Sequence, residues 1–435
     1  MKDLKIIFLT IICLLSTAVF PQATTLSLNQ LLDSAVQNNY LLLANEKNKS
    51  IKLADIEILK TDYQPQISSS ASFSFWKFLL PNKQKLLGDA LTDMFTDISV
   101  YQTVYDWGEN KMKKSVVEDE ILLNDEIRRQ IHNTIVWGVS DTYFEALKAE
   151  AEIATHQNSL VDLNSHLKYA ENLYKIGKVS GLDVLEIQVR ISVEEKNLQK
   201  SKNALIAQEI KIKRLCYIEN SADLNLDTNY NGFFARTQYQ VYINDTLYNI
   251  ISQNHPILNA SERQIELELR QKELYRLENR PELFSYGVAT WEHAYIPFYD
   301  NFNYNIGVGI RYVIPYFGGS GYKTRMTQSN YRTEQLDLEK NQAFLELKQE
   351  LDISINQIND IRYEIENNQK IIRLADETLK NMLVLYQAGQ GDVLDILTAQ
   401  TLLTETTIAY KKSVISYLQT LARLHYLLGN DNYPF

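Results

Sequence analysis

The residue types that most often carry out catalysis or bind metal ions form no recognisable site in this sequence. A common helical zinc site needs histidines at His-Glu-x-x-His spacing, and no such spacing occurs. The histidines are His132, His156, His166, His255, His293 and His425. The sequence also lacks a phosphate-binding glycine loop and a nucleophile elbow. We therefore predict no catalytic residue, no cofactor and no metal, and we predict that the protein is not an enzyme.

Acidic residues at two related positions are the remaining candidates for a chemical role. Asp183 follows Gly177 by six residues, and Asp395 follows Gly389 by six residues. Ser180-x-x-Asp183 and Asp392-x-x-Asp395 both place an acid at the third position of an expected helix. There a carboxylate can accept hydrogen bonds from free backbone amides. The residues alone therefore indicate helix capping.

These acids belong to an internal repeat that organises the whole chain. Leu173-Tyr174-x-x-Gly177 and then Leu182-Asp183-x-Leu185-x-x-Gln188 recur as Leu385-Tyr386-x-x-Gly389 and then Leu394-Asp395-x-Leu397-x-x-Gln400, 212 positions later. Earlier in each half, Pro65-Gln66-Ile67 corresponds to Pro281-Glu282-Leu283. We assign the first repeat to residues 24–229 and the second to residues 230–435, with a polar and aromatic linker at about 230–239.

Long helices dominate each repeat. The chain has only 15 Gly and 8 Pro, which favours long uninterrupted elements. Apolar residues recur at steps of three and four in the second half, as expected for a helix with one buried stripe; they are Leu351, Ile355, Ile358, Ile365, Ile372, Leu379 and Leu383. A helix from about 323 to 387 would be roughly 95 Å long. We expect long antiparallel helices at about 111–219 and 323–428 that pack as coiled coils, with turns at Gly177 and Gly389.

The N-terminus has the layout of a secretory signal peptide. Lys2 and Lys5 precede an apolar run at 6–15, and small residues follow. We assign residues 1–23 to this peptide, which leaves Cys216 as the one mature cysteine and excludes an internal disulfide. No later stretch reaches the roughly 20 apolar residues of a membrane-spanning helix. The net charge of −10 argues against a nucleic-acid partner.

Two segments alternate apolar and polar residues with the period of a β-strand. In the first, at about 67–105, Ile67, Phe73 and Phe75 alternate with serines. The second, at about 283–314, is clearer, since Phe302, Tyr304, Ile306, Val308 and Ile310 alternate with Asn303, Asn305, Gly307, Gly309 and Arg311. One face against outer-membrane lipid and one against a water-filled lumen would explain this pattern. A soluble sheet packed on the helices is the alternative.

The number of strands is too small for one chain to form a transmembrane barrel by itself. Four strands cannot close a transmembrane barrel, for which roughly eight are the minimum, and an open edge in lipid is costly. The chain must therefore associate if the strands enter the membrane, and the strand count permits two, three or four copies.

The sequence resembles the TolC-like outer membrane efflux proteins over essentially the whole mature chain. The residues that carry the resemblance are the doubled tip motif, Pro65-Gln66-Ile67, Pro281-Glu282-Leu283, Asn38-Asn39 and Gln253-Asn254-His255-Pro256. The resemblance implies a mainly helical fold with a small β part. It further implies a homotrimer in the outer membrane, with twelve strands in a shared barrel and the helices forming a periplasmic tunnel. An inner-membrane transporter and a periplasmic adaptor would be its partners.

The resemblance also gives the tip residues possible roles. It implies that Asp183, Asp395 and Asp392 ring the periplasmic entrance as a gate, while helix capping remains the alternative. The adaptor would contact the tips at Tyr174, Gly177, Tyr386 and Gly389, whose simpler roles are packing and turning. Asn303, Asn305 and Arg311 would face the lumen, and for Arg311 we favour a cross-strand charge pair over ion selectivity.

We therefore predict a passive exit duct of a tripartite efflux or type I secretion system. The competing hypothesis is a periplasmic coiled-coil scaffold without a pore. The sequence does not choose among drugs, metals and polypeptides as cargo.

Overall fold

The computed structural model describes residues 25–77, 79–87, 90–219, 224–237, 244–294, 299–312, 321–388 and 390–430. The predicted signal peptide and Gly389 lie outside these residues. Among the helices of the described ranges, none contains a stretch both long enough and apolar enough to span a bilayer.

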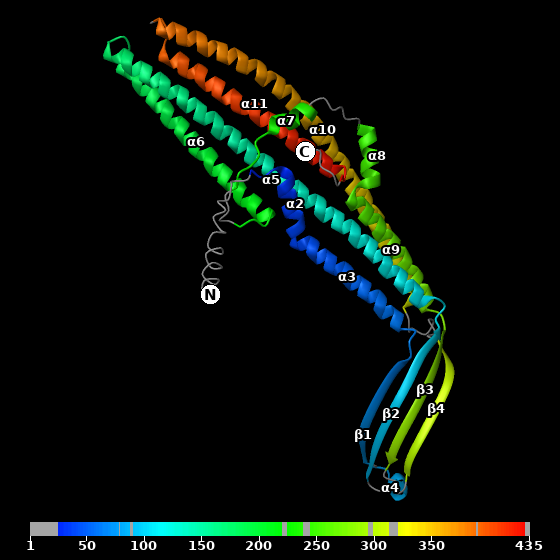
Figure 1. Ribbon diagram of the computed structural model, residues 1–435. Coiled ribbons are helices and arrows are strands. Elements are labelled where there is room, and N and C mark those ends of the chain that lie inside the picture. Colours follow the sequence, from blue (N-terminus) through cyan, green and yellow to red (C-terminus); the bar gives the residue numbers. More distant parts are fainter. Residues whose placement is uncertain are drawn as a thin grey trace, which may run out of the picture. The chain divides into compact units, whose positions relative to one another are not determined.

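The described residues are mainly helical with four strands, and each half of the chain has short helices, then two strands, then two long helices (Figure 1). The first series is α2 Leu28–Asn38, α3 Tyr40–Thr61, β1 Gln66–Lys77, α4 Pro81–Leu87, β2 Ala90–Tyr105, α5 Glu109–Lys175 and α6 Gly181–Leu215. The second is α7 Tyr230–Thr237, α8 Asn244–Asn254, α9 Pro256–Glu278, β3 Glu282–Ala294, β4 Tyr299–Arg311, α10 Tyr322–Gln387 and α11 Val393–Leu427. The predicted fold class is confirmed. The segment expected to be a linker, at 230–239, is helical in its first eight residues, which form α7.

The chain forms two compact units, and each repeat contributes to both. One unit comprises Met1–Leu43, Arg129–His255 and Leu345–Phe435, and the other comprises Ala44–Arg128 and Pro256–Phe344. We call them the helical unit and the sheet unit.

The core of the helical unit follows the predicted apolar stripe. Of its α10 positions, Leu351, Ile355, Ile358, Ile365 and Leu379 are buried. Helix α11 is buried on more than one side, and Tyr417 in its C-terminal half is fully enclosed. The Tyr417 hydroxyl donates a hydrogen bond of 2.8 Å to the Thr237 carbonyl at the end of α7, which satisfies a polar group that would be costly to bury alone. Helix α7 is thus held on the helical unit.

His255 at the end of α8 gives this unit a testable response to pH. Its side chain is 3% exposed, and burial, together with nearby Arg129, lowers its pKa from 6.5 to about 4. The unfolded chain therefore binds a proton at higher pH than the folded chain does. Above pH 6.5, His255 should not reduce the free energy of unfolding of the helical unit. This free energy should fall by about 3 kcal/mol in total as the pH drops to about 4.

Hydrogen exchange of the helical unit, corrected for intrinsic rates, measures this dependence. In a His255→Gln variant, the pH-dependent change in the free energy of unfolding should be smaller by about 3 kcal/mol, because glutamine does not titrate in this range. An unchanged pH dependence in the variant would contradict the assignment.

The sheet unit contains one antiparallel sheet in the order β1-β2-β3-β4, visible at the lower right of Figure 1. In the register, Ser69 pairs with Ile98, Ile98 with Ala289, and Ala289 with Tyr304. Residues in register share a face, so the alternation in each strand adds up to two continuous faces. Strands β1 and β4 form the two edges of the sheet.

Candidate functional site

One face of the sheet is apolar and uncovered. Ile306 and Val308 on β4 are 80% and 78% exposed, and Phe73 on β1 is 73% exposed. The same face carries Ile67, Phe75, Met94, Ile98, Trp291, Phe302, Tyr304 and Ile310, each more than half exposed. A contiguous exposed patch of this kind marks an interaction with lipid or with another protein. The alternative of a sheet whose apolar face packs on the chain's own helices does not fit these exposures.

The opposite face is polar, and it carries the predicted lumen residues. Asn303 and Asn305 are exposed on it, and they pair in register with Thr290 and Val288. The Ser68 and Ser99 hydroxyls on the same face are hydrogen-bonded at 2.7 Å. The small hydroxyl and amide groups on this face can form hydrogen bonds with water.

Two glycines on the polar face are covered by aromatic rings, which sequence analysis did not anticipate. A Cβ at Gly307 would lie 2.8 Å from Tyr286 Cζ, and one at Gly309 would lie 2.7 Å from Phe284 Cζ. Both distances are shorter than any ordinary contact, so a larger residue at either position would require the ring to move. Glycine repeated inside a strand is the signal of such a close approach.

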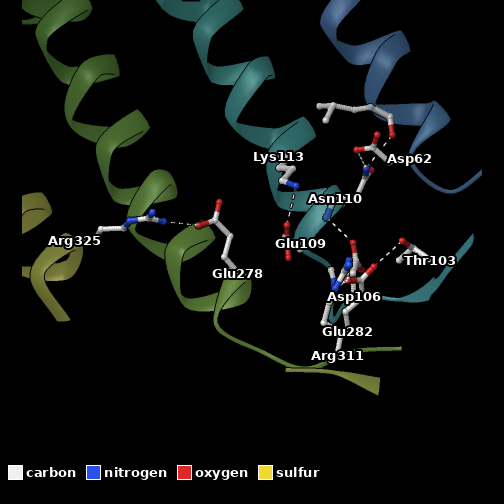
Figure 2. A network of polar contacts seen from close by, with 12 residues as sticks. Asp62, Thr103, Asp106, Glu109, Asn110, Lys113, Glu278, Glu282, Arg311 and Arg325 are labelled. Atoms are coloured by element: carbon white, nitrogen blue, oxygen red, sulfur yellow. Dashed lines mark hydrogen bonds and ion pairs between the residues drawn. The ribbon is translucent and has the colours of Figure 1, made fainter. Parts of the chain in front are cut away.

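Arg311 lies at the end of the polar face, beside Glu282 in the next strand (Figure 2). Its guanidinium donates from Nε to Glu282 Oε2 at 3.0 Å and from Nη2 to the Tyr101 hydroxyl at 3.0 Å. Glu282 Oε1 in turn accepts from the Tyr101 hydroxyl at 3.0 Å and from Thr103 Oγ1 at 2.8 Å. The charge pair that we favoured for Arg311 is present, and it ties β2, β3 and β4 together.

Asp106 joins the end of β2 to the start of α5. Its carboxylate accepts from the backbone N–H of Gly108 at 2.9 Å and of Asn110 at 2.8 Å, so it caps the helix. Burial alone would raise the pKa of Asp106, but the hydrogen bonds from Tyr63, Asn110 and Gly108 outweigh it and lower the pKa. The Asn110 side chain also donates to Asp62 at 2.9 Å, which fastens α3 to α5 (Figure 2).

The first helical tip, between α5 and α6, has the predicted turn. Gly177 has a φ of +72°, which suits glycine because it has no Cβ. The Lys178 N–H donates to the Leu173 carbonyl and the Gly177 N–H to the Tyr174 carbonyl, both at 2.9 Å, as in a Schellman motif. Ser180 caps α6 by accepting from the Asp183 N–H at 3.3 Å. Its hydroxyl donates to the Asp183 carboxylate at 2.5 Å.

The second tip, between α10 and α11, is built differently. Asp392 caps α11 by accepting from the Leu394 N–H at 3.1 Å, whereas the Asp395 side chain is exposed. A Cβ at Gly391 would lie 2.8 Å from the backbone nitrogen of Tyr386, so the chain passes too close for any other residue. The repeat does not point to Gly391, because the equivalent residue in the first repeat is Val179.

Equivalent tyrosines of the two tips have different surroundings. Tyr386 is 6% exposed and belongs to the apolar core between the two helix pairs, whereas Tyr174 is 55% exposed. Burial raises the pKa of Tyr386, and the nearby Asp183 carboxylate adds to the effect. Of the two predicted contact tyrosines, only Tyr174 therefore presents its side chain to solvent in the isolated chain.

Comparisons with known proteins agree with this architecture. The outer membrane efflux protein family matches residues 31–216. No curated protein matches the sequence. Among solved structures, the chain is similar to CusC, with a TM-score of 0.78 and 16% identity over 93% of this chain and 92% of that one.

Two further structures have the same fold. The outer membrane protein VceC of Vibrio cholerae gives a TM-score of 0.74 and 14% identity over 93% of this chain and 96% of that one. The MtrE outer membrane channel of Neisseria gonorrhoeae, solved in its open state, gives 0.73 and 15% over 93% and 89%.

The fold is that of outer-membrane channel proteins. Together with the family match, it confirms the predicted resemblance to the TolC-like outer membrane efflux proteins. The family match covers residues 31–216, and the likeness to these channels over nearly the whole chain is one of fold.

Proposed function

We propose that three copies of the chain form one twelve-stranded barrel in the outer membrane and that the helices continue it as a tunnel across the periplasm. The duct conducts passively as the outermost component of a tripartite efflux system. The observation that carries this proposal is the sheet, which has one apolar uncovered face, one polar face and two unpaired edges.

The two edge strands require the chain to associate with other copies in the membrane. Strands β1 and β4 would leave unpaired backbone groups in lipid, and each such group costs several kcal/mol. Pairing β4 of one copy with β1 of the next satisfies both edges. The strands have 12 to 16 residues, which is enough to cross an outer membrane when tilted.

Cysteine crosslinking across the edges tests the barrel. Ser70→Cys on β1 and Asn305→Cys on β4 place thiols on the polar faces of the two edge strands. Burial raises the pKa of native Cys216 to about 12, so its thiol reacts little. A short bifunctional maleimide should convert the doubly substituted chain into covalent dimers and trimers in intact outer membranes.

A pair with Ile306→Cys in place of Asn305→Cys directs one thiol to the opposite face and should crosslink poorly. The absence of trimers from the first pair, or equal yields from both pairs, would refute the shared barrel. Complete extraction of the chain from membranes by carbonate would favour the periplasmic scaffold instead.

The helical tips are the proposed contact sites of the partners. A periplasmic adaptor would dock around Tyr174 and Gly177 in the first tip and Tyr386 and Gly389 in the second. An inner-membrane transporter would supply energy and choose the cargo. Recovery of a proton-driven exporter with its adaptor after in-cell crosslinking would indicate an efflux outlet, whereas an ATP-driven transporter would indicate polypeptide secretion.

Asp395 is the tip acid that best fits a role in the entrance, because its side chain is exposed, whereas the Asp392 carboxylate caps α11 and the Asp183 carboxylate accepts a hydrogen bond from the Ser180 hydroxyl. In a trimer, each of the three Asp395 carboxylates would attract a multivalent cation with an interaction energy on the order of 1 kcal/mol. Asp395→Ala should therefore weaken block by a trivalent cation at least about tenfold and raise single-channel conductance.

Planar-bilayer recordings measure both quantities. Glu377→Ala, on the exposed surface of α10, is the charge-matched control and should change neither. Unchanged block and conductance in Asp395→Ala would reject the gate.

A further inference from the structure

A cavity of about 250 Å³ lies between α5, α6, α10 and α11, close to the tips of the helical unit. Its apolar wall includes Ile187, Val393, Ile396 and Leu397, all of them buried. For comparison, an engineered apolar cavity of about 150 Å³ binds benzene. The volume is thus sufficient for one substituted aromatic ring.

One buried polar atom at the wall, the hydroxyl oxygen of Tyr386 on α10, has no hydrogen-bond partner within the described residues. His166 on α5 also lines the cavity, and its side chain interacts with that of Gln400. The Tyr386 side chain is 94% buried, being 6% exposed, so solvent does not satisfy its hydroxyl. A buried polar group without a partner costs about 1–3 kcal/mol, which a ligand with one matching polar group would recover.

The charge of the wall restricts the ligand further. The described residues that line the cavity include no Asp, Glu, Lys or Arg. Burial lowers the pKa of His166, and the nearby Asp162 carboxylate and the Gln400 side chain oppose this only in part. A charged ligand would lose its hydration without gaining an opposite charge.

We propose that this cavity is a binding site for a small neutral aromatic molecule that carries one hydroxyl or N–H group, of the size of a phenol. Its ring packs against Ile187 and Leu397, and its polar group bonds to the Tyr386 hydroxyl. Because Ile187 and Tyr386 belong to different helix pairs, the bound molecule links the α5–α6 pair to the α10–α11 pair.

Fluorine NMR of the full-length protein in detergent, titrated with 4-fluorophenol, tests the site. We expect saturable binding that Tyr386→Phe weakens by roughly fivefold, since one hydrogen bond is lost. Fluorobenzene, which lacks the hydroxyl, should bind more weakly by a similar factor. Tyr174→Phe, the equivalent change in the first repeat, should leave binding unchanged because Tyr174 does not line the cavity.

A second variant keeps the test independent of Tyr386. Ser165 lines the cavity from an exposed position on α5, so Ser165→Trp should obstruct it without disturbing the core and should abolish saturable binding. The proposal is overturned if 4-fluorophenol shows only non-saturating partition into the detergent. It is also overturned if both Tyr386→Phe and Ser165→Trp bind the probe as well as the unmodified chain does.

Discussion

Ile306→Arg is expected to remove most of the protein from the outer membrane. Ile306 is 80% exposed in the middle of the apolar face of β4. An arginine facing lipid near the centre of a barrel wall costs about 2–4 kcal/mol, and a trimer would bear this cost three times. We expect the trimer in the membrane fraction to fall at least about thirtyfold, measured by quantitative blotting of unheated samples.

The matched control is Asn305→Arg, one residue earlier. Its side chain lies on the polar face of the same strand, where water would hydrate the new charge. Trimer yield should then remain within about twofold of the unmodified chain. Equal losses in the two variants would mean that the apolar face does not contact lipid, and the proposed barrel would have to be abandoned.

Gly391→Ala is expected to disrupt the second tip. The new Cβ would meet the Tyr386 nitrogen at 2.8 Å and the Leu385 carbonyl carbon at 3.2 Å, and backbone atoms cannot rotate away as a side chain can. Overpacking of this kind costs about 1–3 kcal/mol. Backbone amides at 384–396 should therefore exchange with solvent roughly tenfold to a hundredfold faster, as measured by mass spectrometry.

Gly181→Ala in the first tip is the control for this prediction. Its Cβ would lie 3.5 Å from the Tyr174 ring, an ordinary contact, and alanine favours the helix that begins there. Exchange at the first tip should stay the same or become slower. Similar acceleration in both variants would show that the close approach at Gly391 is not what holds the second turn.

Much of the architecture follows from local patterns, which the sequence contains in full. The three-and-four spacing of Leu351, Ile355 and Ile358 places those side chains on one helix face whatever that helix packs against. The alternation around Ile306 likewise separates two faces of a strand before its neighbours are known. Gly177 ends its helix for a reason confined to a few residues, namely its freedom to adopt positive φ.

The candidate sites depend on contacts between distant residues, and these only the tertiary structure decided. The position of Arg311 in its strand favours a charge pair, but strand register determines that its partner is Glu282. Tyr174 and Tyr386 stand in the same repeated motif, yet one is exposed and the other buried, because each tip packs against different neighbours. Local periodicity sets which face of an element is apolar, whereas register and packing bring together residues that the chain keeps far apart, and no local pattern records that pairing.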